Sequence, residues 1–153
     1  MFQSLMMHLT LRVKGVFMIP NLTQHLASPE QVSDGVVDFL PEARKYLCYL
    51  LTFATVPSAV EIVSRCESIV RFLRMNADAQ DFDFVMIGGA PYLMGPLQCL
   101  LEAEGWEVCF SFTERISVEE VLPDGKVTKI SQFRHCGWVY PPNSDWAQVG
   151  VKS

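Results

Sequence analysis

Apolar positions along the chain form short continuous runs, separated by segments with helical spacing. Three runs, residues 16–19, 82–87 and 106–112, have the length and composition of strands buried in a parallel sheet. The clearest helical segment begins at Pro57-Ser58, where apolar residues recur every three or four positions. The order strand, helices, strand, helix, strand predicts an α/β fold, a Rossmann-like three-layer sandwich with a mostly parallel sheet.

Capping residues and prolines indicate where the other helices begin. Ser28, Pro29 and Gln31 form a capping-box pattern, so a short helix is expected there, ending by Gly35. Pro41 is expected to open a second helix that runs to about residue 51. Pro96 is expected to start a helix rather than lie inside one, because its ring would clash with the carbonyl four residues back. Residues 88–95 are therefore predicted to be a glycine-bracketed loop.

The pattern changes in the last third of the chain. Residues 116–122 and 127–133 flank the turn sequence Pro123-Asp124-Gly125-Lys126, which predicts a C-terminal antiparallel hairpin. The double proline at 141–142 interrupts regular structure. We expect a single domain over residues 18–140, an irregular tail over 141–153, and a leader over 1–17 that is not native, with Met18 as the start.

Composition narrows the classes of function. Twelve Lys and Arg face 17 Asp and Glu, a balance that disfavours binding of long nucleic acids. Arg12 and Lys14 interrupt the N-terminal apolar stretch, and no other run reaches the length of about 20 residues that crosses a bilayer. Five scattered cysteines without a C-x-x-C pair indicate buried, reduced thiols and no zinc site. A cytoplasmic protein without a metal, a cofactor or a membrane partner is expected.

Polar side chains and glycines follow each of the predicted parallel strands. Since such sheets bind ligands at the carboxyl ends of their strands, we expect these residues to line one pocket. The alternatives are turn and cap chemistry in the first loop, a plain tight turn at the glycines, and pairing of Arg115 with Glu114. The candidate ligand-binding residues are Asn21, Thr23, Gln24, Gly88, Gly89, Ala90, Pro91, Ser111, Thr113 and Arg115.

Three residues are candidates for catalysis. His135 and His25 titrate near neutral pH and would act as general acid or base, while Arg134 would hold a phosphate. The alternative is an Arg134 paired with Glu119 or Glu120 and a His135 packed near Trp138. Cys136 is a poor nucleophile for His135, because adjacent residues of a strand point to opposite faces.

Four segments resemble the signature blocks of a small, uncharacterised prokaryotic family. They are Asn21-Leu22-Thr23-Gln24-His25, Met86-Ile87-Gly88-Gly89-Ala90-Pro91, Phe110-Ser111-Phe112-Thr113-Glu114-Arg115 and Phe133-Arg134-His135-Cys136-Gly137-Trp138. The chain is more distantly similar to CRISPR-associated Rossmann-fold (CARF) domains. This second resemblance implies a homodimer that binds a cyclic oligoadenylate in antiviral defence or counter-defence, some small members being ring nucleases. Ala90-Pro91 stands where such domains often have a lysine, so Arg115 or Arg134 would contact the phosphates.

Two hypotheses of different classes follow. The first is a second-messenger protein that binds a small nucleotide. In its enzymatic form, this hypothesis is a metal-independent phosphodiesterase that cleaves the nucleotide through the ribose 2′-hydroxyl. The second is a non-enzymatic protein from a phage or mobile element that docks on a defence or host complex. The second hypothesis depends on the aromatic residues Phe133, Trp138, Tyr140 and Trp146. A transferase or hydrolase acting on a small nucleotide is a third option, for which no residue identifies a leaving group.

Overall fold

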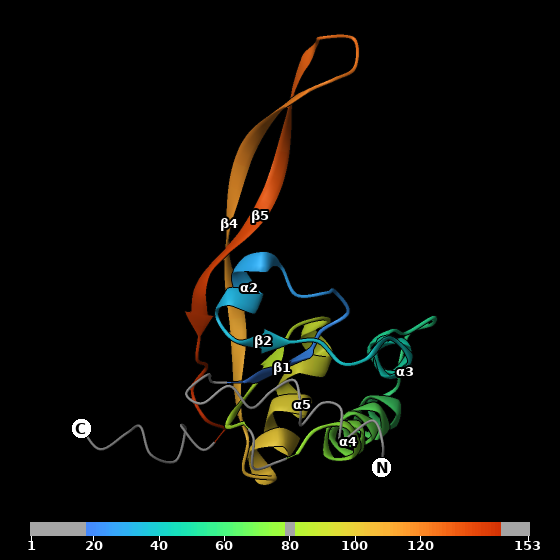
Figure 1. Ribbon diagram of the computed structural model, residues 1–153. Helices are drawn as coiled ribbons and strands as arrows, with labels where there is room; N and C mark the ends of the chain where they lie inside the picture. Colours follow the sequence, from blue (N-terminus) through green and yellow to red (C-terminus); the bar gives the residue numbers. More distant parts are fainter. Residues whose placement is uncertain (1–17, 79–81, 145–153) are drawn as a thin grey trace, which may run out of the picture.

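The computed structural model describes residues 18–78 and 82–144, which form one mixed α/β domain built on a five-stranded sheet (Figure 1). The strand order is β2-β1-β3-β4-β5. The first four strands are mutually parallel and β5 is antiparallel to β4, so the predicted mostly parallel sheet with a C-terminal hairpin is confirmed. The strands are β1 (Ile19–Leu22), β2 (Val36–Val37), β3 (Phe84–Ile87), β4 (Glu107–Val121) and β5 (Val127–Val139).

The three long helices pack on one face of this sheet. Leu22, Val85 and Val108 point to that face and share a buried cluster with residues from all three helices. A smaller cluster on the other face contains Ile19 and Met86 but no residue of the long helices. The predicted three-layer sandwich is therefore not confirmed. In the described residues, the long helices form a single layer on one face of the sheet. The helices are α2 (Pro29–Ser33), α3 (Pro41–Leu51), α4 (Ala59–Asn76) and α5 (Pro91–Ala103).

The first strand lies later in the chain than its hydrophobic run predicts. β1 begins at Ile19, so Pro20 and Asn21 belong to the strand rather than to the loop after it. Pro20 is tolerated because the pairing of β1 with β3 starts only at Asn21, so that ladder loses no donor. Residues 16 and 17 of the predicted strand, and the predicted leader, lie outside the described residues.

The prediction of a loop before Pro96 is wrong. α5 begins at Pro91, a favourable first position, and continues through Pro96. Leu93, on the first turn of the helix, and Leu97, on the next, are both fully buried, so packing stabilises the whole segment as a helix. Gly95 lacks the Cβ that would clash with the proline ring in a helical conformation. The steric penalty at Pro96 is thereby reduced.

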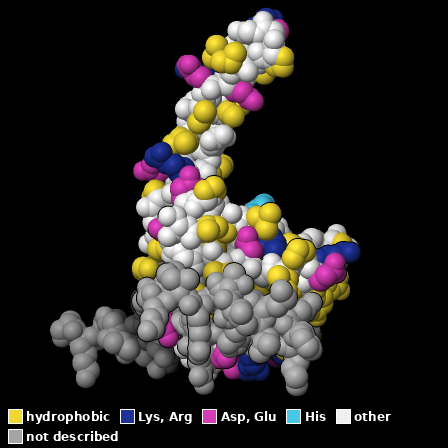
Figure 2. All heavy atoms as spheres, viewed as in Figure 1, with side chains coloured by type: hydrophobic (Ala, Val, Ile, Leu, Met, Phe, Trp, Pro, Cys, Tyr) yellow, Lys and Arg dark blue, Asp and Glu magenta, His cyan; other side chains and the backbone are white. Residues whose placement is uncertain are grey.

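β4 and β5 form a long ribbon that projects from the domain (Figure 1). Its tip is the predicted turn, closed by a hydrogen bond from the Gly125 N–H to the Leu122 carbonyl, with Gly125 at φ 81°. The segment 113–115, predicted to be a loop at the end of a strand, is in the middle of β4 because β5 pairs with it throughout. Figure 2 shows hydrophobic side chains interspersed with charged ones along this ribbon.

The cysteines differ in exposure, which corrects the expectation that all are buried. Cys66 and Cys109 are buried, Cys48 is half-buried, and Cys99 and Cys136 are exposed. Burial raises the pKa of Cys66 to about 11 and that of Cys109 to about 12. Within the described part of the chain, no helix combines the length and the apolar character needed to cross a membrane.

Candidate functional site

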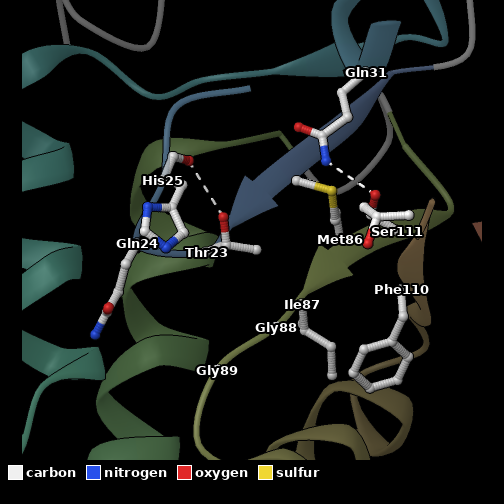
Figure 3. A pocket seen from close by; sticks show the side chains of 11 residues that line it. Thr23, Gln24, His25, Gln31, Met86, Ile87, Gly88, Gly89, Phe110 and Ser111 are labelled. Carbon is white, nitrogen blue, oxygen red and sulfur yellow. Dashed lines mark hydrogen bonds between the residues drawn. The ribbon is translucent and has the colours of Figure 1, made fainter. Parts of the chain in front are cut away.

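A pocket of about 300 Å³ opens at the carboxyl ends of β1 and β3 (Figure 3). The strand order reverses at this point, because β1 is followed by β2 on one side and β3 returns on the other. In open α/β sheets, such a reversal leaves a crevice that commonly binds ligands. The pocket is lined by Thr23, Gln24, His25, Gln31, Met86, Ile87, Gly88, Gly89, Phe110, Ser111 and Thr113.

Asn21 lies in β1 itself and is fully buried, so it is not one of the residues that line the pocket. Its amide nitrogen donates to the His25 carbonyl at 2.8 Å and to Asp38 Oδ1 at 2.7 Å. Its side-chain oxygen accepts from the N–H and the hydroxyl of Thr23. Asn21 thus holds the β1 loop in shape by the turn chemistry that was the alternative interpretation.

The next two polar residues of the loop differ in their surroundings. The Gln24 amide donates to the Leu51 carbonyl and to Thr52 Oγ1, both at 3.1 Å, so it caps the end of α3. Its side chain points away from the pocket (Figure 3). His25 is exposed, and among the described residues none forms a hydrogen bond with its ring. Of this loop, the His25 ring is the group most open to a ligand.

The double glycine after β3 also lines the pocket, next to Thr23. Gly89 has φ 150°, a conformation that residues with a Cβ rarely adopt. Ala90 is the N-cap residue of α5 and Pro91 its first helical residue, so neither of these two candidates lines the pocket. The positive end of the α5 dipole lies next to the glycines, which favours negative charge in the ligand.

A β-bulge brings His135 to the pocket side of the ribbon. Phe112 pairs with Gly137 and Thr113 pairs with His135, so Cys136 is an extra residue in β5. In a regular strand, His135 and Trp138 would point to opposite faces. The bulge turns both to the face that carries Ser111, and their ring centroids are 4.6 Å apart.

The His135 ring is buried and has a partner on each nitrogen. Nδ1 lies 2.6 Å from Ser111 Oγ, and Nε2 lies 2.9 Å from Asp34 Oδ2. Asp34 is the C-cap residue of α2 and its side chain is half-exposed. A serine hydroxyl, an imidazole and a carboxylate are therefore joined in one chain of hydrogen bonds.

The capping box of α2 determines the direction of these bonds. Gln31 Oε1 accepts from the Ser28 N–H at 2.9 Å, so Gln31 Nε2 donates to Ser111 Oγ at 3.1 Å. Ser111 then has its own proton to donate to His135 Nδ1. Because the Asp34 carboxylate only accepts, Nε2 carries the proton of a neutral His135 ring. Because the capping box fixes the Gln31 amide, its bond to Ser111 Oγ leaves the Ser111 proton directed at His135 Nδ1.

The two arginine candidates lie on the exposed ribbon and do not line the pocket. Arg134 pairs with Glu114 at 3.5 Å, where Glu119 or Glu120 was the expected partner, and both side chains are about half exposed. Among the described lining residues there is no Lys, Arg, Asp or Glu. The lining of the pocket therefore carries no formal charge when its histidine is neutral.

The pKa of Glu30, in the first turn of α2, is lowered by its surroundings. Hydrogen bonds from its own backbone N–H and from the Ser28 hydroxyl lower the pKa of Glu30, and the positive charge of Arg134 adds to this effect. Glu30 is therefore an anion at neutral pH. It places a negative charge near Arg134.

Sequence reasoning named His135 and Ser111 as candidates but did not name Gln31 or Asp34, which the structure joins to them. Gln31 was recognised for its part in the capping box, which is also what directs its amide to Ser111. Asp34 is 101 residues from His135 in sequence, and no local pattern connects the two. In the described residues, no group of three His, Cys, Asp or Glu side chains is arranged to hold a metal ion.

Comparison with known proteins identifies a family. The family described as the uncharacterised protein MJ1673 family matches residues 18–139. No curated protein and no solved structure matches the chain. The match spans the sheet, the four described helices and the hairpin. This chain belongs to the MJ1673 family of uncharacterised proteins.

Proposed function

We propose that the protein binds a small nucleotide in the pocket at the ends of β1 and β3. The observation that carries this proposal is that Thr23, His25, Gly88 and Gly89, from the two loops on either side of the strand reversal, line the same pocket. The strand order β2-β1-β3-β4 is shared with doubly wound, Rossmann-like sheets, whose nucleotide sites lie at this position. That likeness is one of fold and sets only the expected place of the ligand.

The lining suits the base and ribose better than the phosphates. Phe110, Met86 and Ile87 offer apolar contacts to a planar base, while Thr23, Gln31 and His25 can meet polar groups. A volume of about 300 Å³ is at the lower end for small-molecule sites. With no lysine or arginine among the described lining residues, the phosphates would extend toward Arg115 and Arg134 on the ribbon.

A cyclic oligoadenylate shared across a homodimer is the ligand that we expect within this class. Its several phosphates would need cations outside the pocket, which the ribbon arginines of two subunits would supply. Cleavage through a ribose 2′-hydroxyl would require His135 to exchange its Ser111 bond for one to the ligand. We therefore propose binding as the function and treat cleavage as a separate outcome of the test.

Thermal-shift measurements test this proposal with cyclic tri-, tetra- and hexaadenylate, cyclic dinucleotides, ATP and adenosine. Chromatography of the same mixtures, with and without EDTA, detects any cleavage products. Thr113→Phe would fill the pocket from its edge, whereas Ser117→Phe places the same ring on the same face of β4 outside the pocket. A stabilisation that T113F abolishes and S117F retains would support the proposal. No stabilisation by any of these compounds would reject it.

The ribbon supports a second candidate, a protein that acts by docking on a partner. Val121, Val127 and Phe133 are 70%, 59% and 72% exposed, whereas Trp138 is half-buried against His135 and Trp146 lies outside the described residues. An isolated two-stranded ribbon is marginally stable in water, which favours a covered state. Pull-downs would favour this candidate if a partner is lost with V121D/F133D but retained with T113F. Sedimentation would show whether that partner is a second copy of the chain.

A further inference from the structure

We propose that Ser111, His135 and Asp34 form a catalytic relay in which Ser111 is the nucleophile that attacks an ester or thioester carbonyl bound in the pocket. The three groups come from β4, β5 and the end of α2, and Ser111 lines the pocket. This inference rests on the proposed function in one respect, because the same pocket holds the substrate. It does not require the substrate to be a nucleotide.

The geometry meets the requirements for activating a hydroxyl. Nucleophile and base must lie within hydrogen-bond reach, and a third group must orient the base. Ser111 Oγ is 2.6 Å from His135 Nδ1, and Asp34 Oδ2 is 2.9 Å from Nε2. Serine hydrolases usually use Nε2 toward the serine and Nδ1 toward the carboxylate. The reversed use of the ring here leaves the chemistry unchanged, since either nitrogen can take the proton.

The structure provides for the protonation state that this chemistry needs. The Gln31 amide donates to Ser111 Oγ, which leaves the serine proton for the unprotonated Nδ1. The carboxylate of Asp34 accepts a hydrogen bond from the ring N–H at Nε2, and it lies where it would stabilise the imidazolium that forms. A regular hairpin has no extra residue, whereas β5 carries one at Cys136, and the resulting β-bulge turns His135 toward Ser111. Bulges that redirect a side chain are common next to active sites.

The reaction is a hydrolysis in two steps. Ser111 Oγ bonds to the carbonyl carbon as its proton passes to His135 Nδ1, and the bond from that carbon to the leaving oxygen or sulfur breaks as the leaving group takes the proton. Water then attacks the acyl carbon and gives a proton to Nδ1, which returns it to Ser111 Oγ as the acid is released. The Gln31 amide and the positive end of α5 lie beside the pocket, where they would offset developing negative charge.

The pocket lining favours a carbonyl over a phosphoryl substrate. Phosphoryl transfer depends on several cations around the reacting phosphate. Among the described lining residues, His25 is the one group that can carry a positive charge. A carbonyl develops only one negative charge in its tetrahedral intermediate, which hydrogen-bond donors can stabilise.

A fluorophosphonate probe reports directly on an activated serine, with intact-protein mass spectrometry as the readout. We expect stoichiometric labelling of the wild-type chain, none of Ser111→Ala, and unchanged labelling of Ser131→Ala, whose serine is exposed on the ribbon. Hydrolysis of short p-nitrophenyl esters should follow the same pattern. Circular dichroism and the unfolding midpoint show that S111A is folded.

Asp34 acts through His135 and is therefore a positioning residue. Since its side chain is half-exposed, Asp34→Asn should leave the fold intact while slowing labelling at least tenfold. Asp34→Glu, which keeps a carboxylate, should recover part of that rate, an effect that a purely structural role does not predict.

Absence of labelling in the folded wild-type chain, or equal labelling of wild type and S111A, would overturn the relay. Labelling is independent of the thermal-shift measurement with nucleotides. Labelling without any nucleotide shift would therefore sustain the relay and reject the proposed function, and a nucleotide shift without labelling would do the reverse.

Discussion

The side-chain amide of Asn21 donates to Asp38 Oδ1 at 2.7 Å and so joins the end of β1 to the residue that follows β2. Asp38 also accepts from the Ala27 N–H, at the other end of the β1 loop. Both ends of the loop that forms one wall of the pocket are therefore tied to a single carboxylate. This explains why a fully buried polar residue stands in a central strand.

Replacing Asn21 tests that network. Asn21→Asp places a second carboxylate against Asp38, so we expect a loss of about 3–5 kcal/mol in unfolding free energy at pH 7. The loss should shrink toward pH 4–5, because like charges raise the pKa of one carboxyl in the folded state and favour its protonated form. Asn21→Ala removes one of the donors to Asp38 and the side-chain bonds to the β1 loop, so it should lose about 1–3 kcal/mol. Denaturant unfolding at both pH values measures this, and an N21D curve that matches wild type at pH 7 would contradict it.

The passage of α5 through Pro96 leads to a second prediction. Pro96→Ala restores a helical N–H and removes the clash with the preceding turn, so stability should rise by about 1–3 kcal/mol. Gly95→Ala has open space for its Cβ, but in the wild-type chain that Cβ meets the proline ring. In the P96A background, G95A should add up to about 1 kcal/mol, and in the wild type clearly less. Equal effects of G95A in the two backgrounds would show that the pre-proline clash is not the limiting factor.

This helix also shows how far local sequence rules reach. Local signals predict several of the elements: the apolar pattern predicts α4 and β3, Pro41 predicts the start of α3, and the turn sequence predicts the terminal hairpin. At Pro96, the local penalty is real but smaller than the gain from burying Leu93 and Leu97 against the sheet. Tertiary packing, which the sequence pattern does not rank against a local rule, decides the outcome.

The site shows the same limit at longer range. That the loops after β1 and β3 meet could be predicted, since carboxyl ends of parallel strands share one edge of a sheet. The distinction between pocket residues and supporting residues could not. Asn21 and Gln24 have the same polar character as Thr23, yet their amides bind Asp38 and the end of α3. Contacts across 80 to 101 residues, such as Gln31 with Ser111 and Asp34 with His135, leave no local signal.

The different exposures of the cysteines predict a pattern of thiol reactivity. Because burial raises the pKa of Cys66 to about 11 and of Cys109 to about 12, both remain protonated and unreactive in the folded chain at pH 8. We expect Ellman's reagent to modify the exposed Cys99 and Cys136 quickly, Cys48 more slowly, and the buried pair only after unfolding in guanidinium. Peptide mapping identifies each site. Modification of Cys109 at the rate of Cys99 in native buffer would contradict the packing of β4 against β3.

The bulge at Cys136 leads to a prediction that separates the extra residue from its side chain. Cys136→Ala keeps the residue count of β5 and changes only an exposed side chain, so we expect stability within about 0.5 kcal/mol of the wild type. Deletion of Cys136 restores regular alternation, after which His135 and Trp138 cannot both face Ser111. One of the two rings then loses its packing, at a cost of about 3–5 kcal/mol.

The His135 Nε2 proton offers a direct readout of this prediction. It is buried and donated to Asp34, so it should give a slowly exchanging, downfield proton resonance in the wild type and in C136A. The resonance should be absent in the deletion variant, and also in Asp34→Ala, which serves as the control because it removes the acceptor while the bulge remains. A deletion variant that retains this resonance would mean that the chain places His135 without the bulge, by a shift of register elsewhere in the ribbon.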